Sequence, residues 1–106
     1  MISAIGSKIR NRRKELGLTL EELAMKADSS KSYIWELENR PVVRPSADKV
    51  SKIAEALGMT VEFLLDDKKE VATRSDLDKA FFRRIEDLDE KKRAQLEKFL
   101  KAIDDE

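Results

Sequence analysis

The sequence predicts an all-α protein, with a five-helix domain followed by a C-terminal extension of two helices. Charged residues make up 42% of the 106 residues and aromatic residues only 6%, which favours helices because strands are enriched in aromatic and β-branched side chains. Only two prolines and three glycines interrupt the chain. Apolar residues also recur at intervals of three and four, the period of an amphipathic helix. The length suffices for one compact domain with an appendage.

The first two helices are expected within residues 3–16 and 20–27. The first repeats apolar residues at helical spacing and then meets Gly17, a residue typical of helix C-termini. Thr19 and Glu22 form the capping-box pattern, in which a hydroxyl and a carboxylate three residues apart each bond to the other's backbone N–H. The apolar positions that follow this cap have the i, i+3, i+4, i+7 spacing of a buried face: Leu20, Leu23, Ala24 and Ala27.

Three more helices are expected before residue 66, each beginning at a hydroxyl residue that can accept a hydrogen bond from the first turn. Ser29 or Ser30 is expected to cap the third helix, Ser46 the fourth and Thr60 the short fifth. Gly58 closes the fourth helix, whose apolar residues repeat the same spacing: Val50, Ile53, Ala54 and Leu57. Residues 1–66 are therefore predicted to form one domain.

Residues 67–74 are polar and aperiodic, which predicts a linker, and residues 75–106 are predicted to form the two-helix extension. Ser75 and Asp89 are expected to cap its helices. Each helix carries an apolar stripe, and a hairpin this thin cannot bury both. A second copy of the chain is the preferred cover, with another protein or the back of the N-terminal domain as alternatives. The residues expected at this dimer or partner contact are Leu77, Phe81, Phe82, Ile85, Leu96, Phe99, Leu100 and Ile103, with Met59 and Phe63 of the fifth helix in addition.

The residue inventory argues against several classes of protein. The chain has no cysteine and no histidine, which excludes disulfides, a His/Cys metal site and catalysis by a Ser–His or Cys–His pair. It also has no glycine-rich phosphate loop and no paired carboxylates in a supporting context, so neither an enzyme nor a bound cofactor is expected. No apolar run approaches the ~20 residues of a membrane span, and the N-terminus lacks a basic-then-apolar signal layout. We therefore expect a cytoplasmic protein.

The formal net charge is zero, but the charges are unevenly distributed. Residues 1–45 hold nine Lys/Arg against six Asp/Glu, whereas residues 70–106 hold nine against eleven. This basic excess is modest, and a solvated surface can also produce it. It nevertheless favours the N-terminal end for contact with an anionic partner such as nucleic acid.

The stretch SSKSYIWELENR, residues 29–40, has an outer face that core packing does not explain. At ~100° per residue, one side of this helix carries Ser30, Ile34, Leu37 and Glu38, and the opposite side carries Ser32, Glu36 and Asn39. Tyr33 and Trp35 flank the polar side, and Lys31 lies near the N-terminal end. A DNA major groove is wide enough to admit such a helix.

Three stretches together carry a family resemblance: LGLTLEELAMKA, SSKSYIWELENR and RPSADKVSKIAEALGMTVEFLL. About 60 of the 106 residues resemble the phage repressor/Cro-like (xenobiotic-response-element type) helix-turn-helix family of bacterial DNA-binding proteins. The resemblance implies a sequence-specific transcriptional regulator, a repressor that binds a two-fold-related operator as a homodimer. Residues 30–39 would then enter the major groove of double-stranded DNA.

The resemblance also implies which residues of that helix read bases: Lys31, Ser32 and Glu36. Their chemistry suits the task, because lysine donates to guanine, serine can donate or accept, and glutamate accepts from cytosine. Tyr33 or Trp35 could touch a thymine methyl group or the sugar-phosphate backbone. The alternatives are that Tyr33 is half-buried, that Trp35 contacts a protein, and that Glu36 only limits affinity through repulsion.

Phosphate contacts are expected from groups at loops and helix ends. The candidates are Asn39, Arg40, Arg44 and the backbone amides at Thr19 and Leu20. Arg10 and Arg12 are weaker candidates, because a solvated face explains them as well. By resemblance, Arg13 and Glu38 form a structural ion pair.

Three positions depart from the family pattern. Leu20 stands where a glutamine is usual, which removes a side-chain contact to DNA. Asp28 stands where the turn usually has glycine, at a small backbone cost. Arg40 replaces another usual glycine and adds a charge near the phosphates.

A second, looser resemblance concerns the tail. The run AFFRRIEDLDEKKR is similar to the C-terminal ends of repressors encoded beside zinc-peptidase or toxin genes. It implies an alternative function, an antitoxin or inhibitory partner that holds a toxin or peptidase through its tail and autoregulates its operon.

Overall fold

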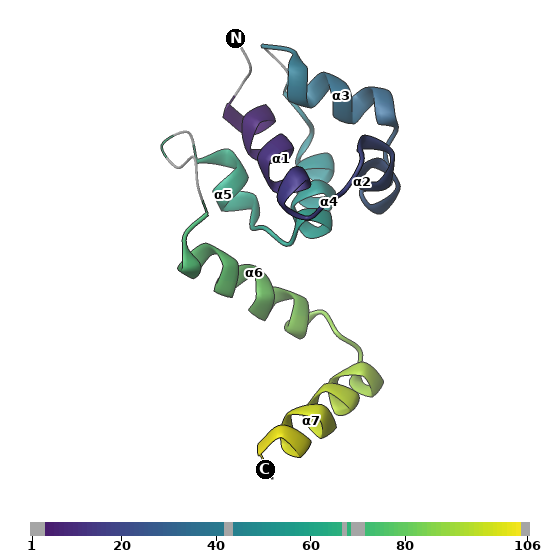
Figure 1. The fold of residues 1–106 in the computed structure, drawn as a ribbon, viewed down its shortest axis with the longest axis vertical. Helices are drawn as coiled ribbons and strands as arrows, with labels where there is room; N and C mark the ends of the chain where they lie inside the picture. Colours follow the sequence, from purple (N-terminus) through teal and green to yellow (C-terminus); the bar gives the residue numbers. More distant parts are fainter. Residues whose placement is uncertain (1–3, 42–43, 67, 69–71, 105–106) are drawn as a thin grey trace.

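The computed structural model describes residues 4–41, 44–66, 68 and 72–104. Within these ranges the chain forms seven α-helices and no strand (Figure 1). The helices are α1 (Ala4–Glu15), α2 (Leu20–Lys26), α3 (Lys31–Asn39), α4 (Ala47–Leu57), α5 (Val61–Leu65), α6 (Arg74–Glu86) and α7 (Glu90–Asp104). The predicted all-α class is confirmed, with five short helices gathered at one end and two helices extending from them.

Helices α1 to α5 enclose one hydrophobic core. Its members come from all five helices and from the short segments between them. They are Ile9, Leu23, Ala24, Ala27, Ile34, Leu37, Val50, Ile53, Ala54, Leu57, Met59, Phe63 and Leu64. Met59 and Phe63 were suggested as dimer residues, but they are 5% and 4% exposed. Their side chains belong to this core and expose little surface to a second chain.

The predicted caps of α2 to α5 are present. Thr19 and Glu22 form the capping box, with both hydrogen bonds at 3.0 Å. Ser30, not Ser29, caps α3, and the hydroxyls of Ser46 and Thr60 accept hydrogen bonds from the first turns of α4 and α5. These caps satisfy backbone N–H groups that have no partner within the helix.

The cap of α6 differs from the prediction. Thr73, not Ser75, precedes the helix, and its hydroxyl accepts a hydrogen bond from Asp76 N at 3.2 Å. The Asp76 carboxylate accepts from Thr73 N at 2.8 Å. The sequence carries two overlapping patterns of a hydroxyl residue and an aspartate three residues apart, and the earlier one is used. Asp89 does accept from Lys92 N at 2.8 Å, as expected of the cap of α7.

The extension leaves the domain as an elongated arm, and the described molecule measures 52 × 27 × 24 Å. Figure 1 shows α6 beside α4 and α5, and α7 projecting beyond α6 at an angle to it. Only Asp76 and Ala80 of α6 are buried, and α7 has no buried residue among those described. The apolar stripes of the extension are therefore not packed against the domain.

Candidate nucleic-acid interface

Helices α2 and α3 form the helix-turn-helix, and the tight turn between them depends on Asp28. This residue has a φ of 51°, a left-handed conformation that aspartate tolerates better than most residues. The Lys49 ammonium donates to the Asp28 carbonyl at 3.0 Å, and the Lys52 ammonium lies 3.3 Å from its carboxylate. The hydrogen bond and charge of Asp28 also raise the pKa of Lys52, together with Asp48. Two cations of α4 thus support the turn that lacks the usual glycine.

One side of α3 is fixed by the core, as the helical wheel predicts. Ile34 and Leu37 are fully buried, and Glu38 is 1% exposed. Lys31, Ser32 and Asn39 are exposed on the other side. The core therefore determines the orientation of α3 and directs its polar side outward.

The two aromatic residues of α3 occupy different environments. Tyr33 is half-buried and packs against the core, with the Lys49 ammonium 5.7 Å from its ring centroid. Burial raises the pKa of Tyr33, and the Glu36 carboxylate adds to this effect. Trp35 is 48% exposed. Of the two, Trp35 has the larger surface available to a macromolecule.

The polar groups on the outer side of α3 contact one another in the free protein. The Lys31 ammonium lies 3.3 Å from the Glu21 carboxylate of α2, and the Arg40 guanidinium lies 3.8 Å from the Glu36 carboxylate. The Asn39 amide donates to the carbonyl of Trp35 at 2.9 Å. Exposed ion pairs are weak, so Lys31 and Arg40 can exchange these carboxylates for an anionic ligand. Sequence reasoning missed Glu21, because no pattern links residues ten positions apart on two helices.

Arg13 and Glu38 form a bidentate ion pair behind this surface. Arg13 Nε lies 2.8 Å from Glu38 Oε2, and Nη2 donates to Oε1 at 2.9 Å. Arg13 Nη1 also donates to the Leu18 carbonyl at 2.9 Å. The hydrogen bond to Glu38 raises the pKa of Arg13. The ion pair connects α1 to α3, and the hydrogen bond to Leu18 adds the loop that precedes α2. The position of the pair is therefore structural.

The candidate phosphate-binding residues lie around the two ends of the motif. Arg40 and Arg44 are exposed beyond the C-terminus of α3. Thr19 is exposed at the start of α2 with its hydroxyl in the capping box, whereas Leu20 packs against the core. The Leu20 side chain is therefore only partly exposed.

Arg12 has a structural role that the sequence did not reveal. Its Nε donates to the Leu57 carbonyl at 2.9 Å, and its Nη1 lies 3.1 Å from Glu15. It thereby satisfies a carbonyl at the C-terminus of α4, where the helix dipole favours a cation. The expected solvated face is therefore wrong for Arg12. No periodic signal could have predicted a bond that joins two helices.

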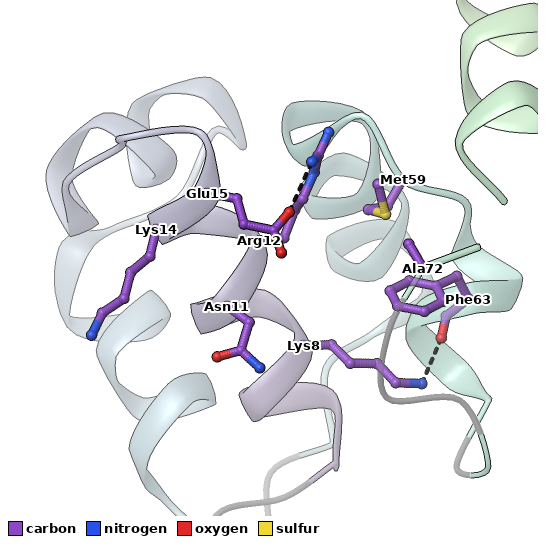
Figure 2. Close-up of a pocket in the computed structure, with 8 residues that line it drawn as sticks. All are labelled: Lys8, Asn11, Arg12, Lys14, Glu15, Met59, Phe63 and Ala72. Atoms are coloured by element: carbon purple, nitrogen blue, oxygen red, sulfur yellow. Dashed lines mark hydrogen bonds and ion pairs between the residues drawn. The ribbon is translucent and has the colours of Figure 1, made fainter. Parts of the chain in front are cut away.

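A cavity of about 440 Å³ lies away from α3 (Figure 2). It is lined by Lys8, Asn11, Arg12, Lys14, Glu15, Met59, Phe63 and Ala72. Lys8 is 4% exposed and donates to the Phe63 carbonyl at 2.7 Å and to the Asp66 carbonyl. Its ammonium also lies 4.8 Å from the Phe63 ring centroid. Lys8 thus joins α1 to the end of α5. Of the residues considered for DNA contact, the cavity is lined only by Arg12, a weaker candidate whose side chain bonds to the Leu57 carbonyl.

Among the residues that the structure describes, no group of three or more acidic side chains is placed to hold a metal ion. No described helix combines the length and the apolar character that crossing a membrane requires.

Comparison with known proteins agrees with this geometry. A family model described as helix-turn-helix matches residues 9–64. The chain is 36% identical over 83 residues to the HTH-type transcriptional regulator SinR of Bacillus subtilis (strain 168), an alignment that covers 78% of this chain and 75% of that protein.

Two solved structures resemble the protein as well. One is the crystal structure of SinR, the master regulator for biofilm formation, in complex with DNA. It has 40% identity and a TM-score of 0.56 over 58% of this chain and 98% of that chain. The other is a SinR protein/SinI protein complex, with 28% identity and a TM-score of 0.58 over 96% of this chain and 99% of that chain.

Proposed function

Since the chain belongs to the helix-turn-helix family of phage repressor type, we propose that it is a sequence-specific repressor that binds double-stranded DNA in the cytoplasm. This family is a class of transcriptional regulators and not of enzymes. The observation that carries this proposal is the orientation of α3. Its apolar side is fully buried, and its polar side faces outward at the surface of the domain. The similar protein SinR has been crystallised with DNA.

We assign base reading to the N-terminal half of α3. Lys31 and Ser32 lie in its exposed first turn, the part of a recognition helix that reaches base edges. Glu36 lies one turn further along and can accept from cytosine. Trp35 is exposed, and we assign to it a contact with a thymine methyl group or the DNA backbone. Tyr33 is half-buried, so its part is limited to the edge of its ring.

We assign phosphate binding to the flanks of the motif. Arg40 and Arg44 supply positive charge beyond the C-terminus of α3, and the backbone at Thr19 and Leu20 lies at the start of α2. The Thr19 amide would have to release the Glu22 carboxylate before it could bind a phosphate. Asn39 would have to release the Trp35 carbonyl before its amide could bind a phosphate. Phosphate contacts of this kind give affinity and register without sequence preference.

We propose further that the protein acts as a homodimer formed by its extension. The apolar side chains that the extension exposes are Leu77, Phe81, Phe82, Phe99, Leu100 and Ile103. Ile85 and Leu96 lie beside them and are half-buried. A single chain leaves this surface in water, which is unusual for a stable monomer. A second copy supplies the same surface in an isologous contact.

Selection of DNA ligands from a random pool, followed by footprinting, tests the DNA-binding function. The expected result is a two-fold-related sequence with half-sites about one helical turn, ~34 Å, apart or a multiple of it. Affinity should also fall steeply with salt, because each neutralised phosphate releases counterions. Equal binding to the selected and unselected pools would show that the protein does not read sequence.

In the second candidate function, the extension binds another protein. Either that protein inhibits this one, or this one inhibits that protein. The SinR/SinI complex supports it, because the similarity to that SinR chain spans 96% of this one, including the extension. A partner that acts in this way should compete with dimerisation. In sedimentation experiments the dimer should be replaced by a one-to-one complex, and DNA affinity should fall with it. A partner that binds and leaves the dimer intact would argue against this mechanism.

A further inference from the structure

Helix α6 presents two different faces, and only one of them is apolar. Its apolar stripe consists of the exposed Leu77 and Phe81 and the half-buried Ile85, and Leu88 continues it just beyond the helix. A second stripe at spacings of four, three and four residues consists of Asp76, Ala80, Arg83 and Asp87. At ~100° per residue, the centres of the two stripes are separated by roughly a third of a turn. The helix can therefore contact the domain with one stripe while the other stays free.

The second stripe contacts the corner between α4 and α5. Ala80 is 4% exposed. Together with Arg83 and Asp87 it borders a narrow groove of about 150 Å³, whose opposite wall includes Ala54, Gly58 and Val61. Ala80 is therefore the apolar side chain of α6 that this corner covers.

A bidentate ion pair fixes the same stripe to α5. Arg83 Nη1 donates to Glu62 Oε2 at 2.8 Å, and Nη2 donates to Oε1 at 3.1 Å. The planar guanidinium matches a carboxylate in only a few orientations, so such a pair constrains the angle between two elements. The pKa of Glu62 is held at about 2, chiefly by the hydrogen bond from Arg83.

The N-terminal end of α6 is fixed independently. Ala72 packs against the core, and Thr73 and Asp76 form the capping box one residue later. Asp76 is 6% exposed. Contact with the domain is thus marked by the packing of Ala72, the burial of Ala80 and the ion pair of Arg83.

We propose that Ala80, Arg83 and Glu62 form a rigid joint that sets the operator half-site spacing to which the dimer binds. This inference rests on the proposed function. If the extensions of two chains join through their apolar stripes, the direction of α6 fixes where each domain lies. The distance between the two copies of α3 then follows from the joint. DNA-bound half-sites must match that distance along the duplex.

The test uses full-length protein and a charge reversal. In Arg83→Glu the ion pair becomes a repulsion, and the double variant Glu62→Arg/Arg83→Glu restores it with exchanged charges. Lys79→Glu is the matched control, because it makes the same charge change on an exposed residue of α6. Each protein is measured on the selected operator and on operators with 2, 5 and 10 additional base pairs between the half-sites.

We expect the wild-type protein and Lys79→Glu to prefer one spacing by at least roughly tenfold, since each spacing change rotates or displaces a half-site. Arg83→Glu should show a clearly smaller preference among the spacings than Lys79→Glu, and the double variant should recover the preference. A preference in Arg83→Glu equal to that of Lys79→Glu would overturn the proposal.

A second measurement does not require DNA. Backbone ¹⁵N relaxation should give α6 and the domain one correlation time in the wild-type protein and two in Arg83→Glu. Two correlation times in the wild-type protein would overturn the joint, whatever the DNA result. Failure of the wild-type protein to select DNA would remove the proposed function and the spacing role with it, while relaxation would still decide whether the joint exists.

Discussion

Loss of Arg13 should strongly destabilise the domain. Its partner Glu38 is 1% exposed, so Arg13→Ala leaves a buried carboxylate without its counter-ion. We expect the free energy of unfolding to fall by about 3–5 kcal/mol, the usual cost of breaking a buried pair from one side. Urea denaturation measures it, with Lys14→Ala on the exposed side of the same helix as the control. A loss within about 1 kcal/mol of that control would mean that the pair is dispensable.

Replacing Lys31 and replacing Arg44 with alanine should have different effects on DNA binding. A base contact by Lys31 makes Lys31→Ala change the relative affinity for operators that differ at one base pair, by ~1–3 kcal/mol for a good contact. Arg44→Ala should instead weaken binding to all sequences alike and reduce the salt dependence by about one counterion. Titrations against a panel of operators separate the two. An unchanged preference profile for Lys31→Ala would contradict the base-reading assignment.

Glu62 gives a prediction about pH. Its folded pKa of about 2 lies below the ordinary value of 4.5, so the ionised form is the one that the folded state stabilises. The contribution is present above about pH 4.5 and is lost as the pH falls through about 2. It should be small because the pair is exposed. In Arg83→Gln the pKa of Glu62 should rise toward 4.5 in a carbon-detected NMR titration, whereas Arg84→Gln should leave it near 2.

For single residues, the sequence predicted burial or exposure wherever these follow from the spacing of residues along a helix. The wheel separated the buried side of α3 from its polar side, and the structure contains the Arg13–Glu38 pair that the family resemblance implied. Long charged side chains were less predictable. Lys8 and Arg12 reach carbonyls on other helices, and such bonds depend on a tertiary arrangement that spacing along the chain does not encode.

Thr73 gives the prediction at the scale of one element. Its hydroxyl caps α6, so Thr73→Ala should destabilise the start of that helix by ~1 kcal/mol. Ser75→Ala is the control, because Ser75 lies inside the helix and is exposed. Hydrogen exchange of the first-turn amides of α6 should be faster in Thr73→Ala only. Equal effects of the two substitutions would favour Ser75 as a second cap.

The elements themselves were largely predictable because each has local signals at its ends. Hydroxyl caps begin α2, α3, α4 and α5, and Gly58 ends α4 with a φ of 64°. The docking face of α6 has no such signal. A stripe of Asp76, Ala80, Arg83 and Asp87 resembles a solvated face, and only the neighbouring corner of α4 and α5 makes it a contact.

The whole molecule combines a domain with a closed core and an arm whose apolar side chains are uncovered. The sequence predicted the arm's need for a partner, since two apolar stripes cannot be buried in a thin hairpin. It could not predict that the arm is attached through a polar and small-residue stripe. That attachment leaves the apolar side chains free to meet a second copy, which the packing of those stripes on the domain would have prevented.

Removing residues 67–106 tests whether the domain binds DNA and the extension forms the dimer. All thirteen residues of the buried core lie between positions 9 and 64, so a chain that ends at Asp66 should still fold. It should sediment as a monomer and retain contact with one half-site. Its affinity for a complete operator should fall by ~10²–10⁴-fold, because the second domain is no longer held at a high effective concentration. The matched full-length variant is Phe99→Asp/Ile103→Asp, which places charges on exposed apolar positions of α7 and should behave in the same way. A truncated chain that still sediments as a dimer would place the dimer contact in the domain instead of the extension.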